Sequence, residues 1–224
     1  MKSGGFLTIH PARIADDVKQ MIDEMRRNPL YSFIKPYIEK PVIWTYEAKT
    51  AFTDGIRIYM SPVFAHVMLS KKYGAKEAEE YWAGLSGMEQ RDSKCRQKYN
   101  SIYTRYLRFI LIHEVYHILY NHVRRGALKY GGKPTEAEHE LGNIAMDLEI
   151  NRDIESTFEE LRGATETISG IWYKNEKYYK SDGTIFKKDI WEDVWDDWME
   201  AGKEFKTEDP LNREDVNPVQ KSSK

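Results

Sequence analysis

The sequence contains a single cysteine, Cys95, and no long apolar run. One cysteine cannot form a disulfide within the chain, which excludes a disulfide-stapled scaffold and favours a reducing compartment. No stretch approaches the ~20 apolar residues that a membrane-spanning helix needs. Near the N-terminus, Pro11 and the charged residues after it come before the ~7–15 apolar residues of a signal peptide can accumulate. We therefore expect a cytoplasmic protein with no membrane partner.

The chain also lacks a large excess of either charge, with 34 Lys and Arg against 36 Asp and Glu. This near-neutral balance gives no electrostatic reason to expect nucleic acid as a partner. Hydrophobic residues make up 41% and aromatic residues 13% of the chain, a composition typical of a globular protein with a packed core. Its 224 residues are enough for one sizeable domain.

The first half of the chain contains both helical and strand-like patterns. Apolar residues at helical spacing predict an amphipathic helix over residues 12–27. Short runs of β-forming residues predict strands over residues 41–46 and 56–60. The Asp54-Gly55 pair before the second of these strands is a turn signal and indicates a hairpin. Together these patterns predict a small mixed or antiparallel sheet.

Two longer helices are predicted in the second half. A helix that is apolar on nearly every face runs from about residue 101 to residue 125, and such a helix is normally buried. Gly126 is a natural terminator for it. Thr135 and Glu138 have the spacing of a capping box, which predicts the start of another helix over residues 136–155. The residues expected to face the core from this helix are Leu141, Ile144, Ala145 and Leu148.

The C-terminal quarter is less regular. Residues 163–188 are rich in Gly, Lys and Tyr and are predicted to form a loop with short strands. Residues 189–201 predict a short acidic helix with three Trp on one side, which offers either core packing or a site for a protein partner. From residue 203 to residue 224 the chain is polar and is predicted to be a disordered tail.

The sequence HEVYH, residues 113–117, lies in the middle of the apolar helix. His113 and His117 are four residues apart and share a helix face, so both imidazoles can reach one metal ion. Glu114 then faces a metal-bound water and can take its proton. The alternative is a buried helix whose histidines hydrogen-bond to core groups, which would leave the Glu114 carboxyl buried without a purpose. The motif therefore predicts a zinc (Zn²⁺) site with Glu114 as general base.

A catalytic zinc needs a third protein ligand and an open position. His122 follows His113 by nine residues, which on a continuous helix places it half a turn out of phase and ~13 Å along the axis. It could join the site only if the helix broke. On the second helix, Asn143, Asp147 and Asn151 form a polar stripe that suits a carboxylate ligand with amide neighbours. We predict Asp147 as the third ligand; the alternative is a carboxylate that anchors a buried amide network.

Other polar residues are assigned simpler roles. Glu149 points to a different face of the second helix and is interpreted as a solvated side chain. His139 lies near the start of that helix and is interpreted as a surface histidine. The oxyanion-stabilising group is not identified by the sequence, and Tyr116, His139 and Tyr173 are its candidates.

The two motifs together resemble a known family. HEVYHILYNHVRRG (113–126) followed by NIAMDLEIN (143–151) is similar to the metallopeptidase domain that usually precedes a von Willebrand factor A-like domain in bacterial and phage proteins. That family carries H-E-x-x-H-x-x-x-x-H-x-x-R and then N-x-A-x-D-x-x-I-N. The matching positions here are His113, Glu114, His117, His122, Arg125, Asn143, Ala145, Asp147, Ile150 and Asn151. The resemblance spans roughly residues 10–200.

The resemblance implies a zincin-like α+β fold over residues 1–202, with the small sheet packed on the buried metal helix and the second ligand helix beside it. It implies a zinc-dependent metallopeptidase that hydrolyses a peptide or protein substrate, with Asp147 completing the ligand set. If strand 56–60 is a sheet edge, it would pair with an extended substrate. Two other functions stay open: a zinc-binding regulatory or structural module without turnover, and a metal-free adaptor that uses helix 189–201.

Overall fold

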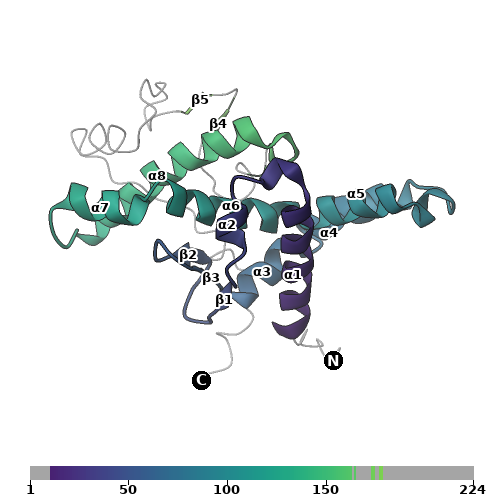
Figure 1. Cartoon of the computed structure of the whole chain (residues 1–224), viewed down its shortest axis with the longest axis horizontal. Helices are drawn as coiled ribbons and strands as arrows, with labels where there is room; N and C mark the ends of the chain where they lie inside the picture. The colour runs from purple at the N-terminus through teal and green to yellow at the C-terminus, as the bar shows by residue number, and fades with distance from the viewer. Residues whose placement is uncertain (1–10, 163, 165–172, 175–176, 179–224) are drawn as a thin grey trace, which may run out of the picture. The chain divides into compact units, whose positions relative to one another are not determined.

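The computed structural model describes residues 11–162, 164, 173–174 and 177–178. Within them the chain is mixed α+β and mostly helical, with a small three-stranded mixed sheet (Figure 1). Its internal contacts divide it into two compact units. The first contains the described residues up to Phe52 together with Arg57–Arg108, and the second contains Thr53–Ile56 and the described residues from Phe109 onward.

The elements as far as Tyr103 are short helices and strands. In chain order they are α1 (Pro11–Arg27), η1 (Pro29–Tyr31), α2 (Lys35–Ile38), β1 (Ile43–Trp44), β2 (Ala51–Thr53), β3 (Ile58–Met60), α3 (Pro62–Met68), α4 (Gly74–Ala83), η2 (Glu89–Arg91) and α5 (Ser93–Tyr103). The predicted helix over residues 12–27 is confirmed as α1, which packs on α2 and α3. Its apolar stripe is buried throughout, as Ile14, Val18, Met21, Ile22 and Met25.

The three-stranded sheet has the order β1-β3-β2, so β3 is its middle strand. Strand β1 runs parallel to β3, and β2 lies on the other side of β3, with the turn at Asp54 and Gly55 joining β2 to β3. In that turn Gly55 has φ +88°, and the Ile56 N–H donates to Asp54 Oδ1 at 2.8 Å. The predicted turn is therefore present, but it joins β3 to β2, a strand that the sequence did not predict; the two predicted strands correspond to β1 and β3 and pair in parallel. An extended substrate could pair with this strand only if the strand were at the edge of the sheet. Strand β3 has a neighbouring strand on each side, so this pairing is excluded.

Gly74, the first residue of α4, lies where α4 and α5 pack against each other. A Cβ at this position would overlap the backbone carbonyl of Tyr103, which cannot rotate away as a side chain can. We expect Gly74→Ala to lower the free energy of unfolding by about 1–3 kcal/mol, measured by urea denaturation. Gly87→Ala is the control, because nothing lies within 4 Å of a Cβ there. Equal denaturation midpoints for the two variants would contradict this packing.

The prediction of one continuous apolar helix from residue 101 to residue 125 is wrong. The structure has α6 (Arg105–Leu119) and α7 (His122–Tyr130), and the chain between them turns at Asn121, which has φ 56°. Asn tolerates this left-handed conformation better than most residues, so it can break the helix where no glycine is present. Gly126 lies inside α7 and does not end it. The left-handed residue that follows α7 is Gly131, with φ 65°.

The second predicted helix is confirmed as α8 (Glu136–Thr157), followed by η3 (Glu159–Leu161). Its capping box is present: the Glu138 N–H donates to Thr135 Oγ1, and the Thr135 N–H donates to Glu138 Oε2 at 2.7 Å. The residues expected to face the core, Leu141, Ile144, Ala145 and Leu148, are all buried. Two short antiparallel strands follow, β4 (Tyr173–Lys174) and β5 (Lys177–Tyr178). They agree with the short strands predicted in that region.

The predicted acidic helix at 189–201 and the predicted tail at 203–224 lie outside the described residues, as does most of segment 163–188. The extent of the predicted domain, residues 1–202, therefore stays a prediction. Among the helices that the structure describes, none is both long enough and apolar enough to cross a membrane.

Candidate metal centre

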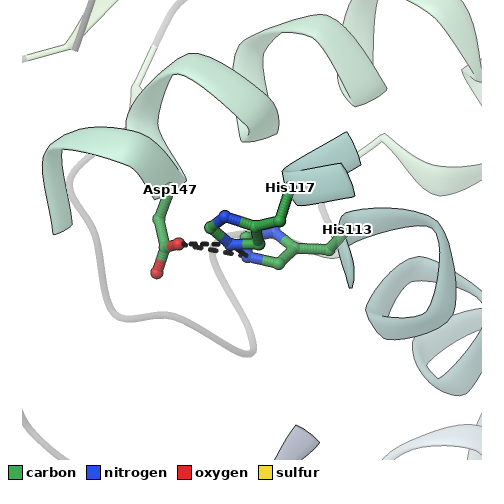
Figure 2. Close-up of side chains that lie close together, drawn as sticks. All are labelled: His113, His117 and Asp147. Carbon is green, nitrogen blue, oxygen red and sulfur yellow. Dashed lines mark hydrogen bonds and ion pairs between the residues drawn. The ribbon is translucent and has the colours of Figure 1, made fainter. Parts of the chain in front are cut away.

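Helices α6 and α8 bring three potential ligands together in the second unit (Figure 2). His113 and His117 come from successive turns of α6, and Asp147 comes from α8. Asp147 Oδ1 lies 3.1 Å from His113 Nε2 and 3.2 Å from His117 Nε2. The two Nε2 atoms are 3.1 Å apart. This group could hold a metal ion, and it consists of the three residues that the sequence predicts as ligands.

The geometry of the group fits a small tetrahedral cation. Ligand atoms ~2.0–2.1 Å from a tetrahedral zinc ion lie ~3.3 Å from one another. The three separations between these ligand atoms are 3.1–3.2 Å, close to that value. Two imidazole nitrogens and one carboxylate oxygen are also donors that zinc accepts. Three ligands from the described part of the chain would fill three of the four tetrahedral positions.

Asn151 fixes the orientation of the first histidine. It lies one helical turn after Asp147 on α8 and is 2% exposed. Its Oδ1 is 3.0 Å from His113 Nδ1. An amide oxygen only accepts hydrogen bonds, so it holds the His113 proton on Nδ1 and leaves Nε2 able to bind a metal. Two of the three residues in the polar stripe predicted on this helix, Asp147 and Asn151, therefore contact the site. Asn143 is instead exposed and contacts His139, which is exposed as expected.

Electrostatic interactions among the site's own groups keep the carboxylate ionised. Burial by itself would raise the pKa of Asp147, but the charge of His113 and hydrogen bonds to both histidines hold it well below its ordinary value. Burial lowers the pKa of His113, yet attraction to Asp147 and hydrogen bonds to Asp147 and Asn151 raise it overall to about 8. Burial lowers the pKa of His117 to about 4. Metal binding to these residues would therefore displace a proton, chiefly from His113.

Glu114 follows the first histidine on α6 and is 7% exposed. Burial raises the pKa of its carboxyl group, the positive charge of His113 lowers it, and the negative charge of Asp147 raises it, for a final value of about 7. A carboxylate with a pKa near neutrality suits a group that takes up a proton and then releases it. The sequence prediction of Glu114 as a general base is compatible with this environment.

His122 is not one of the three ligands, but it contacts one of them, His117. It is 1% exposed, and its Nδ1 is 3.0 Å from His117 Nδ1. The sequence excluded it as a ligand on the assumption of a continuous helix, and that assumption is wrong because the chain turns at Asn121. The break brings His122 back to the edge of His117 that faces away from the three ligand atoms.

Glu149 is not the solvated side chain that the sequence predicted. Only 12% of its side chain is exposed, and Oε2 lies 2.9 Å from His122 Nε2 and 3.4 Å from Arg125 Nη1. The prediction failed because the positions of His122 and Arg125 depend on the helix break. A pointer was available in the sequence, since His122 and Arg125 are three residues apart and share a helix face.

The oxyanion candidates are not brought to the site by any described contact. The Tyr116 hydroxyl is engaged by the side chain of Thr157, and His139 contacts Asn143. Tyr173 lies in strand β4.

Comparison with known proteins adds no assignment: no family model, no curated protein and no solved structure matches this chain. The resemblance drawn from the two motifs therefore stays a prediction.

Proposed function

We propose that this protein is a zinc-dependent peptidase with a zincin-like arrangement of its ligand helices. The observation that carries the proposal is the convergence of His113, His117 and Asp147 from α6 and α8. Glu114 follows the first ligand in the sequence and is buried. In this arrangement α6 is the metal helix and α8 is the second ligand helix. The proposed zincin-like fold includes packing of the small sheet on the metal helix.

Each residue has a separate role in the proposed reaction. His113 and His117 would hold the ion through Nε2, and Asp147 through its carboxylate. When bound, zinc supplies a Lewis acid that polarises a carbonyl group and makes water a better nucleophile near neutral pH. Glu114 accepts a proton from the attacking water and passes it to the leaving amine, so its carboxylate is regenerated in each cycle.

The main alternative is a zinc-binding regulatory or structural module of the same fold. Structural zinc sites are almost always closed by four protein ligands, whereas catalytic sites keep a position open. The ligand group within the described part of the chain has three members. This count favours catalysis over a structural role.

Zinc dependence is the direct test of the proposal. Purified protein is expected to contain about one zinc ion per chain, and His113→Ala and His117→Ala are each expected to lose it. Peptide-library cleavage should stop after zinc is removed with a chelator and return when zinc is restored. His139→Ala, a change at an exposed histidine, is the control and should keep both properties. Stoichiometric zinc in the double variant at positions 113 and 117 would refute the site, and zinc without cleavage would favour the non-catalytic module.

A further inference from the structure

The ring of His117 makes a polar contact on each of its two edges. Its Nε2 faces the ligand group, 3.2 Å from Asp147 Oδ1. Its Nδ1 lies 3.0 Å from Nδ1 of His122, the first residue of α7. The two nitrogens of an imidazole point in different directions, so His122 contacts His117 on the edge away from the ligand group. His122 is therefore placed to act on His117 and not on the ion.

This contact continues to a carboxylate on α8. His122 Nε2 lies 2.9 Å from Glu149 Oε2, and Arg125 Nη1 donates to the same oxygen at 3.4 Å. His122 is 1% exposed, and the Glu149 side chain is 12% exposed. The row of side chains thus runs from α6 through α7 to α8 and ends at a carboxylate that a guanidinium group holds.

Metal binding would assign every proton in this row. A histidine that binds a metal through Nε2 carries its proton on Nδ1, so His117 must donate from Nδ1. The partner atom, His122 Nδ1, must then accept, which places the His122 proton on Nε2. That N–H donates to the carboxylate oxygen of Glu149, 2.9 Å away. Each nitrogen has one role, and no two donors face each other.

The helix break at Asn121 makes this arrangement possible. On a continuous helix, His122 would follow His117 by five residues and would be rotated about 140° away from it. The left-handed Asn121, with φ 56°, redirects the chain so that the two rings meet with their centroids 5.1 Å apart. The uncommon backbone conformation therefore has a specific consequence at the site.

We propose that His122 is a positioning residue for the metal site and that Glu149 is its anchor. Together they hold His117 in the ring orientation and the tautomer whose Nε2 binds the metal. The inference rests on the proposed zinc site. Groups that orient metal-binding histidines in this way typically change metal affinity ~10–100-fold when they are removed.

The test uses His122→Phe and His122→Gln in the full chain. Phe keeps a ring in the buried position but removes the acceptor, whereas the Gln side chain retains an oxygen that can accept from His117 Nδ1–H. We expect the zinc Kd of His122→Phe, measured by competition with a chromogenic chelator, to rise ~10–100-fold at unchanged stoichiometry. His122→Gln should lie between His122→Phe and wild type, and Glu149→Gln should also weaken zinc binding.

Two further readouts separate positioning from simple packing. The absorption spectrum of Co²⁺ bound in place of zinc reports ligand geometry and should change in His122→Phe. The control His139→Phe makes the same substitution at an exposed histidine, and both its Kd and its cobalt spectrum should equal those of wild type. Unfolding temperatures of the metal-free variants measure any effect on packing separately.

Several results would overturn the positioning role. An unchanged Kd and cobalt spectrum in His122→Phe, even with a lower unfolding temperature, would make His122 a packing residue only. Complete loss of zinc at saturating concentration would make it a ligand. Equal behaviour of His122→Gln and His122→Phe would show that the acceptor is irrelevant. Absence of zinc from wild type would overturn the proposed site as well, whereas the other three outcomes leave that site standing.

Discussion

Glu114→Gln is expected to bind zinc with wild-type stoichiometry while peptide cleavage falls by about 10²–10⁴-fold, the usual contribution of a general acid–base residue. The substitution preserves the shape of a side chain that is 7% exposed but removes its ability to accept a proton. Zinc content by atomic spectroscopy and kcat on the best library peptide are the two measurements. They separate the proposed base from the proposed ligands, because a ligand variant loses both.

The control for this variant is Glu159→Gln, the same change at an exposed carboxylate in η3. It should retain wild-type kcat and zinc content. Cleavage by Glu114→Gln at the wild-type rate would eliminate Glu114 as the base, even if the metal site were correct. Loss of zinc from Glu114→Gln would instead show that the substitution disturbs α6, and Glu114→Asp, which keeps the carboxylate but shortens the side chain, would then test whether the position of the carboxylate matters for cleavage.

Asp147→Asn is expected to weaken zinc binding by more than about 100-fold, beyond the ~10–100-fold range of residues that only orient a ligand. The Asp147 carboxylate contacts both histidines at 3.1 and 3.2 Å, and the charge of His113 with hydrogen bonds from both histidines holds its pKa well below the ordinary value. Asn has almost the same shape but offers a neutral oxygen. Chelator competition measures the change in Kd.

Asp23→Asn provides the matched control, because it makes the same change at a carboxylate on α1 whose side chain is 46% exposed. Its zinc Kd should equal that of wild type. A near-wild-type Kd for Asp147→Asn would remove Asp147 from the ligand set. The assignment of His113 and His117 as ligands would still stand, because their alanine variants test it independently.

The spacing of residues along the chain was sufficient to predict several helices. The stripe from Ile14 to Met25 predicted α1, and Thr135 with Glu138 predicted the start of α8. Both predictions rest on contacts between residues three or four positions apart, which a helix creates by its own geometry. The same logic placed His113 and His117 on one face of α6, with Glu114 beside them.

The break between α6 and α7 could not be predicted from the sequence pattern, because no glycine or proline marks it. Asn121 adopts a left-handed conformation that costs a non-glycine residue energy and persists when surrounding contacts compensate for it. Those contacts include the buried pairing of His122 with Glu149, which are 27 residues apart. The prediction of Glu149 as a solvated side chain failed for the same reason.

The sequence by itself determined the pair of histidines, the adjacent glutamate and the polar stripe on the following helix, because these depend only on helical spacing. It also predicted Asp147, on that stripe, as the third ligand. The tertiary structure decided that Asp147 meets His113 and His117, that Asn151 supports His113, and that His122 and Glu149 stand behind His117. These contacts join residues on different helices. Their distances depend on how α6, α7 and α8 pack, which spacing along one helix does not specify.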